Sequence, residues 1–129
     1  MRSIVTSIAI ALALASPALA QTPQARSNFI DRLEKVFLNA GIDLPILGNE
    51  ETVPPMVRPK GQIYPKMTIN GYRTVGKPFV YKAMTDWKIL ENAKAVGFNS
   101  VEIMGYDRFW YFDLTAGVPQ CDIDRVICR

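Results

Sequence analysis

The chain contains no histidine, and this absence excludes more chemistry than any motif supplies. Without an imidazole there is no His-dependent triad, no general base of the usual kind near neutral pH, and little to complete a zinc site. The sequence has no G-x-S-x-G setting for a nucleophilic serine, and no glycine-rich stretch opens a helix as a phosphate-binding loop does. We therefore expect no nucleotide, metal or other cofactor.

Cysteine is scarce, with only Cys121 and Cys128 near the end of the chain. Their spacing is not C-x-x-C, which argues against a redox pair, and no histidine is present to share a metal site with them. In an exported protein an even count of two predicts one disulfide. It would close a loop of about eight residues and stabilise the fold by roughly 2.5 kcal/mol.

Long apolar runs are also absent, apart from one near the start of the chain. Residues 1–20 carry a cation at Arg2, an apolar run from Ile8 to Ala15, and the small residues Ala18 and Ala20 before Gln21. This is the pattern of a cleaved signal peptide; the alternative, a membrane anchor, needs roughly 20 apolar residues. We predict a mature chain of residues 21–129, periplasmic or extracellular, with no membrane span.

Charge of one sign is not concentrated anywhere. The formal net charge of the 129 residues is only +3, and acidic and basic residues are interspersed. A nucleic-acid interface needs a clustered basic surface, so we expect no nucleic-acid partner. Removing twenty residues from 129 leaves 109, which fits a single small domain.

What the chain does contain is a periodicity that changes along its length. Residues 21–40 read as an amphipathic helix with Phe29, Leu33 and Phe37 on one stripe and Arg26 facing away, ended by Gly41. The following segments are expected in order: an edge strand at 42–47, a proline-rich loop at 48–65, strands at 66–72 and 79–84, a helix at 85–96, and strands at 101–104 and 108–114. The pattern predicts an α+β domain in which two helices cover one face of a mostly antiparallel sheet of four or five strands.

The strand at 108–114 is aromatic on both faces. Alternation places Trp110, Phe112 and Leu114 toward the core, and Phe109 and Tyr111 on the opposite face. We expect the second face to include Asp113 with Glu102 and Met104 and to be extended by Phe79 and Tyr81. Aromatic rings beside polar groups suit a binding surface. The alternative is that the proline-rich loop or the tail covers this face as a second small core.

These residues lead to a hypothesis of an exported binding module, without enzymatic activity, for a protein, peptide or cell-envelope component. The site would consist of Phe79, Tyr81, Phe109 and Tyr111. A different class, a small hydrolase, would use Glu102 with Asp113 or Asp107 as paired carboxylates. A third, structural possibility is assembly of copies of the chain through an open sheet edge.

Overall fold

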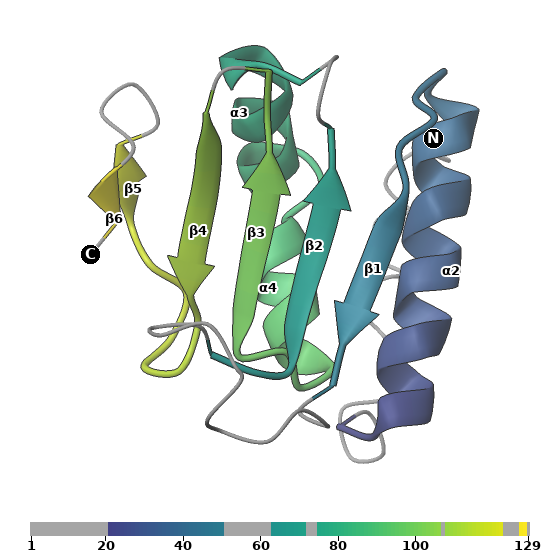
Figure 1. Cartoon of the computed structure of the whole chain (residues 1–129), viewed down its shortest axis with the longest axis vertical. Coiled ribbons are helices and arrows are strands. Elements are labelled where there is room, and N and C mark those ends of the chain that lie inside the picture. The colour runs from purple at the N-terminus through teal and green to yellow at the C-terminus, as the bar shows by residue number, and fades with distance from the viewer. Residues whose placement is uncertain (1–20, 51–62, 72–74, 107, 123–126, 129) are drawn as a thin grey trace, which may run out of the picture.

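A computed structural model describes residues 21–50, 63–71, 75–106, 108–122 and 127–128. The helices are α2 (Pro23–Asn39), α3 (Lys77–Thr85) and α4 (Ile89–Ala95). The strands are β1 (Ile46–Asn49), β2 (Lys66–Asn70), β3 (Ser100–Met104), β4 (Phe109–Asp113), β5 (Cys121–Asp122) and β6 (Ile127–Cys128). The first four strands form one sheet, β5 and β6 form a separate hairpin, and the predicted α+β domain is confirmed (Figure 1). The predicted signal peptide lies outside the described residues.

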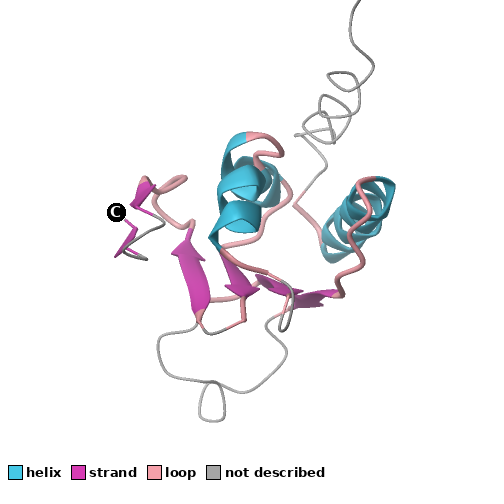
Figure 2. Cartoon of the chain, turned by 90° about the horizontal axis from the view of Figure 1, so that it is seen from above, coloured by secondary structure: helices cyan, strands magenta, loops and turns pink. Residues whose placement is uncertain are grey.

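The four-stranded sheet has the order β1-β2-β3-β4. The pairs β1–β2 and β3–β4 are antiparallel, whereas β2–β3 is parallel. A parallel pair needs a crossover connection, and α3 and α4 lie in the connection between β2 and β3. Viewed from above, the three helices lie on one side of the sheet (Figure 2). The other side has no helix among the described residues.

Helix α2 forms where the sequence predicts it. The Thr22 hydroxyl accepts a hydrogen bond from the Ala25 amide at 3.0 Å, and Pro23 occupies the first turn. The helix ends in a Schellman motif, in which the Ile42 and Gly41 amides donate to the Phe37 and Leu38 carbonyls. Gly41 has a φ of +78°, which a residue without a Cβ adopts at little cost.

The predicted strand at 79–84 is wrong, because these residues lie in helix α3. Pro78 favours a first helical turn, and Val80 and Ala83 are buried at a spacing of three, which suits a helix. Six residues are too few for their periodicity to separate the two states. Lys88, with a φ of +49°, then separates α3 from α4, so the described residues form three helices where two were predicted.

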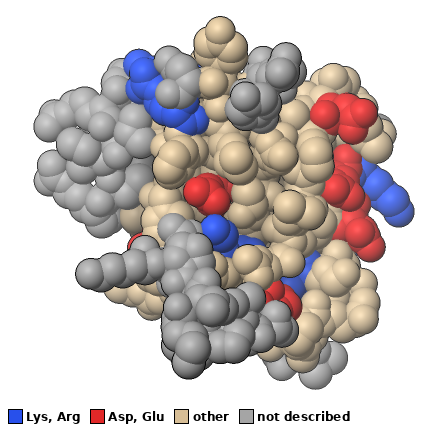
Figure 3. Space-filling model, in the orientation of Figure 1, with Lys and Arg blue, Asp and Glu red and all other residues tan. Residues whose placement is uncertain are grey.

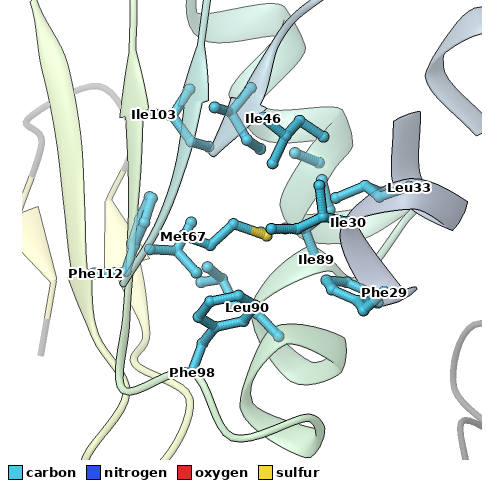
Figure 4. Close-up of a cluster of buried hydrophobic side chains, with 14 of the residues drawn as sticks. Phe29, Ile30, Leu33, Ile46, Met67, Ile89, Leu90, Phe98, Ile103 and Phe112 are labelled. Atoms are coloured by element: carbon cyan, nitrogen blue, oxygen red, sulfur yellow. The ribbon is translucent and has the colours of Figure 1, made fainter. Parts of the chain in front are cut away.

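The core lies between the helices and the sheet. Phe29, Ile30 and Leu33 of α2 form one cluster with Met67, Ile103 and Phe112 of the strands and with Ile89 and Leu90 of α4 (Figure 4). Trp110, Phe112 and Leu114 belong to this core, as alternation predicted. None of the helices that the structure describes is long and apolar enough to cross a membrane.

Candidate binding surface on the open sheet face

The side of the sheet opposite the helices, called here the open face, is defined by the strand register. Paired residues in a sheet share a face, so the ladder assigns them to three rows across the strands. The rows are Asn70, Met104 and Phe109; Leu47, Thr68, Glu102 and Tyr111; and Asn49, Lys66, Ser100 and Asp113. Figure 3 views this face and shows a few charged side chains near its middle within a mostly uncharged surface.

Among the strand residues of the open face, Phe109 is the most exposed aromatic side chain, with 60% of its surface accessible. It begins β4 and pairs with Met104 at the end of β3, beside the turn between these strands. Tyr106, in that turn, is 74% exposed. Asn70, Met104 and Phe109 at this end of the open face, together with Tyr106 of the adjoining turn, are called the turn end below. Its apolar side chains Met104 and Phe109 are carried by the paired strands β3 and β4.

The opposite end of the open face is covered by the segment that enters β2. The Ile63 amide donates to the Tyr111 hydroxyl at 2.9 Å, and the Ser100 hydroxyl donates to the Ile63 carbonyl. The Asn99 side-chain amide donates to the Tyr64 carbonyl at 2.9 Å. Tyr111 is therefore half-buried and anchored by its hydroxyl, so the predicted aromatic face is accessible mainly at Phe109.

The central charged pair on the open face is Lys66 with Glu102. The Lys66 Nζ lies 3.2 Å from the Glu102 Oε1, and only 12% and 16% of the two side chains are exposed. Lys66 also lies over the Tyr64 ring, with its Nζ 5.8 Å from the ring centroid. These contacts hold the Glu102 carboxylate against a cation in the middle of the sheet.

Asp113 lies on the same face as Glu102, as the sequence predicted, but has a local structural role. Its Oδ1 accepts hydrogen bonds from the Thr115 hydroxyl at 2.6 Å and from the Thr115 amide at 2.9 Å. The bond from the Thr115 hydroxyl, which has the larger effect, and the bond from the Thr115 amide lower the pKa of Asp113 below its ordinary value of 3.8. The side chain is exposed and stabilises the turn that follows β4.

The arrangement gives the hydrolase hypothesis no support. A glycosidase needs one carboxyl group whose pKa is raised so that it can act as the acid. The pKa of Asp113 is lowered instead, and Glu102 is paired with Lys66. The third candidate, Asp107, lies outside the described residues. Among the residues the structure describes, no group of three or more acidic side chains could hold a metal ion.

Two of the four predicted site residues lie elsewhere, so the expectation that they extend the open face is wrong. Phe79 and Tyr81 belong to α3, on the helical side of the sheet. The Phe79 ring packs against Phe37 and Trp87, with centroids 5.5 and 5.8 Å away. Tyr81 is 63% exposed and lines a separate cavity of about 240 Å³ with Val118. The cause is the helical structure of residues predicted to form a strand.

The backbone of the C-terminal hairpin brings the two cysteine positions together. Cys121 pairs with Cys128 in the antiparallel β5–β6 ladder. Directly paired residues in such a ladder have Cα atoms about 4.5 to 5.5 Å apart, within the range that a disulfide spans. The cysteine side chains are outside the described part of the structure, so the disulfide stays a prediction.

A partly buried ion pair was missed by the sequence reasoning. Arg26 is buried, although the sequence was interpreted as placing it on the solvent side of α2. Its Nε and Nη2 donate to the Glu50 carboxylate at 2.8 and 2.6 Å, and its Nη1 donates to the Val96 carbonyl at 3.3 Å. The pair borders a cavity of about 250 Å³ that is also lined by Ile30 and Phe98. The available signal was spacing, because Arg26 precedes Phe29 by three residues and Ile30 by four.

Comparison of the chain with models of known protein families, with curated proteins and with solved structures finds no match.

Proposed function

We propose that the chain is an exported binding module that recognises a protein, peptide or cell-envelope component at the turn end of its open face. The observation that supports this proposal is the exposure of Phe109, 60% accessible on a sheet face that no described helix covers. Exposed apolar side chains that gather in one place mark interaction surfaces more often than isolated ones do. Met104 beside Phe109 and Tyr106 in the adjacent turn make this a group.

The physical case rests on rigidity as well as area. Phe109 is carried by β4, whose neighbours Trp110 and Phe112 are buried in the core. The backbone beneath the ring is therefore held in place before a partner arrives. An aromatic ring has few rotatable bonds, so it contributes contact area at a small cost in side-chain entropy. In the row next to Phe109, the Tyr111 side chain is held in place by the hydrogen bond that its hydroxyl accepts from the Ile63 amide.

The location proposed for this function is the periplasm or the extracellular medium. It rests on the signal-peptide pattern of residues 1–20 and on the predicted pairing of Cys121 with Cys128. Expression of the full chain in a secreting host tests it. The expected result is an exported protein whose amino terminus is Gln21. A product that stays in the cytoplasm with residues 1–20 attached would contradict export.

The binding proposal is tested by crosslinking at single positions. A photoreactive benzoylphenylalanine replaces Phe109 in one variant and Tyr81 in a matched control. Both side chains are aromatic and similarly exposed, 60% and 63%, but they lie on opposite sides of the sheet. Incubation with the cell-envelope and secreted fractions should give one discrete adduct from position 109 that is absent from position 81. Competition by unlabelled wild-type protein, but not by the Phe109→Ala variant, identifies the turn end as the contact.

An equal pattern of adducts from both positions, or competition by Phe109→Ala that matches the wild type, would show that the open face is not the binding surface. Circular dichroism of each variant serves as the folding control. Since Phe109 is exposed, its replacement should leave stability within about 0.5 kcal/mol of the wild type. Loss of binding in Phe109→Ala can then be separated from loss of fold.

A further inference from the structure

The outer edge of β4 carries backbone groups that no other described strand pairs with. In an antiparallel pair, alternate residues direct their N–H and C=O groups toward the partner strand. The Gly105 amide donates to the Arg108 carbonyl, and the Leu114 amide donates to the Asn99 carbonyl. These two hydrogen bonds show that the backbone N–H and C=O groups of every second residue from Arg108 to Leu114 point toward β3. Phe109, Tyr111 and Asp113 therefore direct their backbone groups outward, and no strand in the described part of the chain pairs with them.

The two edges of the sheet differ in how they are protected. Helix α2 lies beside β1; Pro45 precedes that strand and Gly48 lies within it, and both residue types weaken strand pairing. Strand β4 has neither proline, glycine nor lysine between Phe109 and Asp113. The β5–β6 hairpin lies off the sheet beyond β4 and is not paired with it (Figure 1). A five-residue aromatic edge without these protections is suited to accept another strand.

The side chains along this edge indicate which residue types an added strand should carry. Phe109 and Tyr111 stand on the open face at the two apolar positions, and the exposed carboxylate of Asp113 stands at the third. Across an antiparallel pair, aromatic rings favour β-branched residues and a carboxylate favours a cation. The matching strand therefore reads basic-x-apolar-x-apolar from its amino end, because it runs opposite to β4.

We propose that β4 binds an extended peptide segment of a partner protein as an antiparallel fifth strand, with a basic residue opposite Asp113 and β-branched residues opposite Tyr111 and Phe109. This inference deepens the proposed function, on which it rests, by naming the partner class and the binding mode. Three residue pairs in this register exchange about six backbone hydrogen bonds. Main-chain bonds provide affinity, and the alternate side chains provide selectivity.

The probe is a synthetic peptide, Thr-Lys-Thr-Val-Thr-Val-Thr, added to isotope-labelled protein of residues 21–129. In the free protein, the amides of Phe109, Tyr111 and Asp113 should exchange rapidly with solvent, whereas those of Trp110 and Phe112 should exchange slowly. Peptide at millimolar concentration should protect the first three amides and shift their resonances. Slow exchange of these amides in free protein, caused by a second copy or by the chain's own hairpin, would overturn the proposal, as would unchanged resonances.

Two methylated peptides separate strand pairing from other binding. In one, N-methyl groups on the lysine and both valines block the amides that face β4. In the other, N-methyl groups on the three threonines that follow those residues leave the facing amides free. The first should bind at least tenfold more weakly than the second, because it loses the backbone hydrogen bonds that its three facing amides would donate to β4. Equal binding of the two peptides would refute strand addition.

The charged position and the open face are tested separately. Replacing the peptide lysine by glutamate should weaken binding to wild-type protein severalfold, and Asp113→Asn should abolish this preference. If the methylated peptides bind equally while the Phe109 adduct persists, strand addition is wrong and the proposed function stands. If strand pairing is observed but Phe109→Ala has no effect on binding, the edge is a site and the proposed role of the open face is wrong.

Discussion

The Arg26–Glu50 pair allows the effect of burial on the energy of an ion pair to be measured, because its two members differ in burial. The Arg26 side chain is 9% exposed and the Glu50 side chain is 31% exposed. Arg26 donates to both oxygens of Glu50 and to the Val96 carbonyl, and its guanidinium lies 5.9 Å from the centroid of the Phe98 ring. Removing either partner leaves the other in a different environment, so the two losses should be unequal.

Glu50→Gln leaves the guanidinium buried without a counterion. Such a loss costs about 3 to 5 kcal/mol for a fully buried pair. Because water reaches Glu50, we expect about 2 kcal/mol. Arg26→Met removes the buried charge and fills much of its volume, while Glu50 turns to solvent, so the expected loss is about 1 kcal/mol. The double variant should resemble Arg26→Met alone, which corresponds to a coupling energy of about 2 kcal/mol.

The measurement is urea unfolding of wild type, both single variants and the double variant, followed by circular dichroism and fluorescence. Comparison of midpoints is valid if the slopes agree. Asp43→Asn is the control, since it neutralises one exposed carboxylate and should change the unfolding free energy by less than about 0.5 kcal/mol. A Glu50→Gln variant that unfolds like the control, or an Arg26→Met variant that loses more than Glu50→Gln, would refute the argument from unequal burial.

Three further outcomes are expected. In urea unfolding, Gly97→Ala should destabilise the protein by about 2 kcal/mol or more and Gly41→Ala by about 1 kcal/mol. Both glycines have a positive φ, but only at Gly97 would an added Cβ meet a neighbour, the Arg26 Nη1 at 2.6 Å. Equal losses would contradict this steric argument. Thr115→Val should raise the pKa of Asp113 toward its ordinary value in an NMR titration. Since its folded-state pKa is lowered, ionised Asp113 stabilises the wild type at pH values above the unfolded pKa near 3.8, and this stabilisation should be lost as the pH falls through the folded pKa. An unchanged pKa of Asp113 in Thr115→Val would contradict the role of the hydroxyl. Tyr111→Phe should cost about 0.5 to 1.5 kcal/mol in thermal or urea unfolding, since the hydroxyl accepts a backbone hydrogen bond from the segment before β2, and a variant as stable as wild type would show that water replaces it.

Prediction from the sequence succeeded where one periodicity was strong over a whole element. The alternation in β4 correctly separated Trp110 and Phe112 from Phe109 and Tyr111. The same reasoning put Glu102 on the face of Tyr111, and the register confirms it. Half of the candidate site could therefore be predicted, because the side chains of a strand alternate between two faces whatever the partner strand is.

Prediction failed where a short segment fitted two states. Phe79 and Tyr81 were assigned to a strand, and their helix places them across the sheet from Phe109. Arg26 was assigned to solvent because it lies outside the apolar stripe of α2, yet Glu50, distant in sequence, supplies the counterion that allows burial. The first error arose because the segment was too short for its period to decide between helix and strand, and the second because the partner of Arg26 lies far away in the chain, where a local pattern does not reach.

Local sequence determined the start and end of α2, the glycine-terminated ends of α2 and α4, the alternation of β4 and the exclusion of histidine chemistry. Each of these depends on residues within one or two turns of each other, or on composition alone. Tertiary structure decided that residues 77–85 are helical, that Arg26 is buried, and that β4 is an edge strand with Phe109 exposed. These features depend on contacts between residues far apart in the chain, because burial and pairing are properties of neighbours in space.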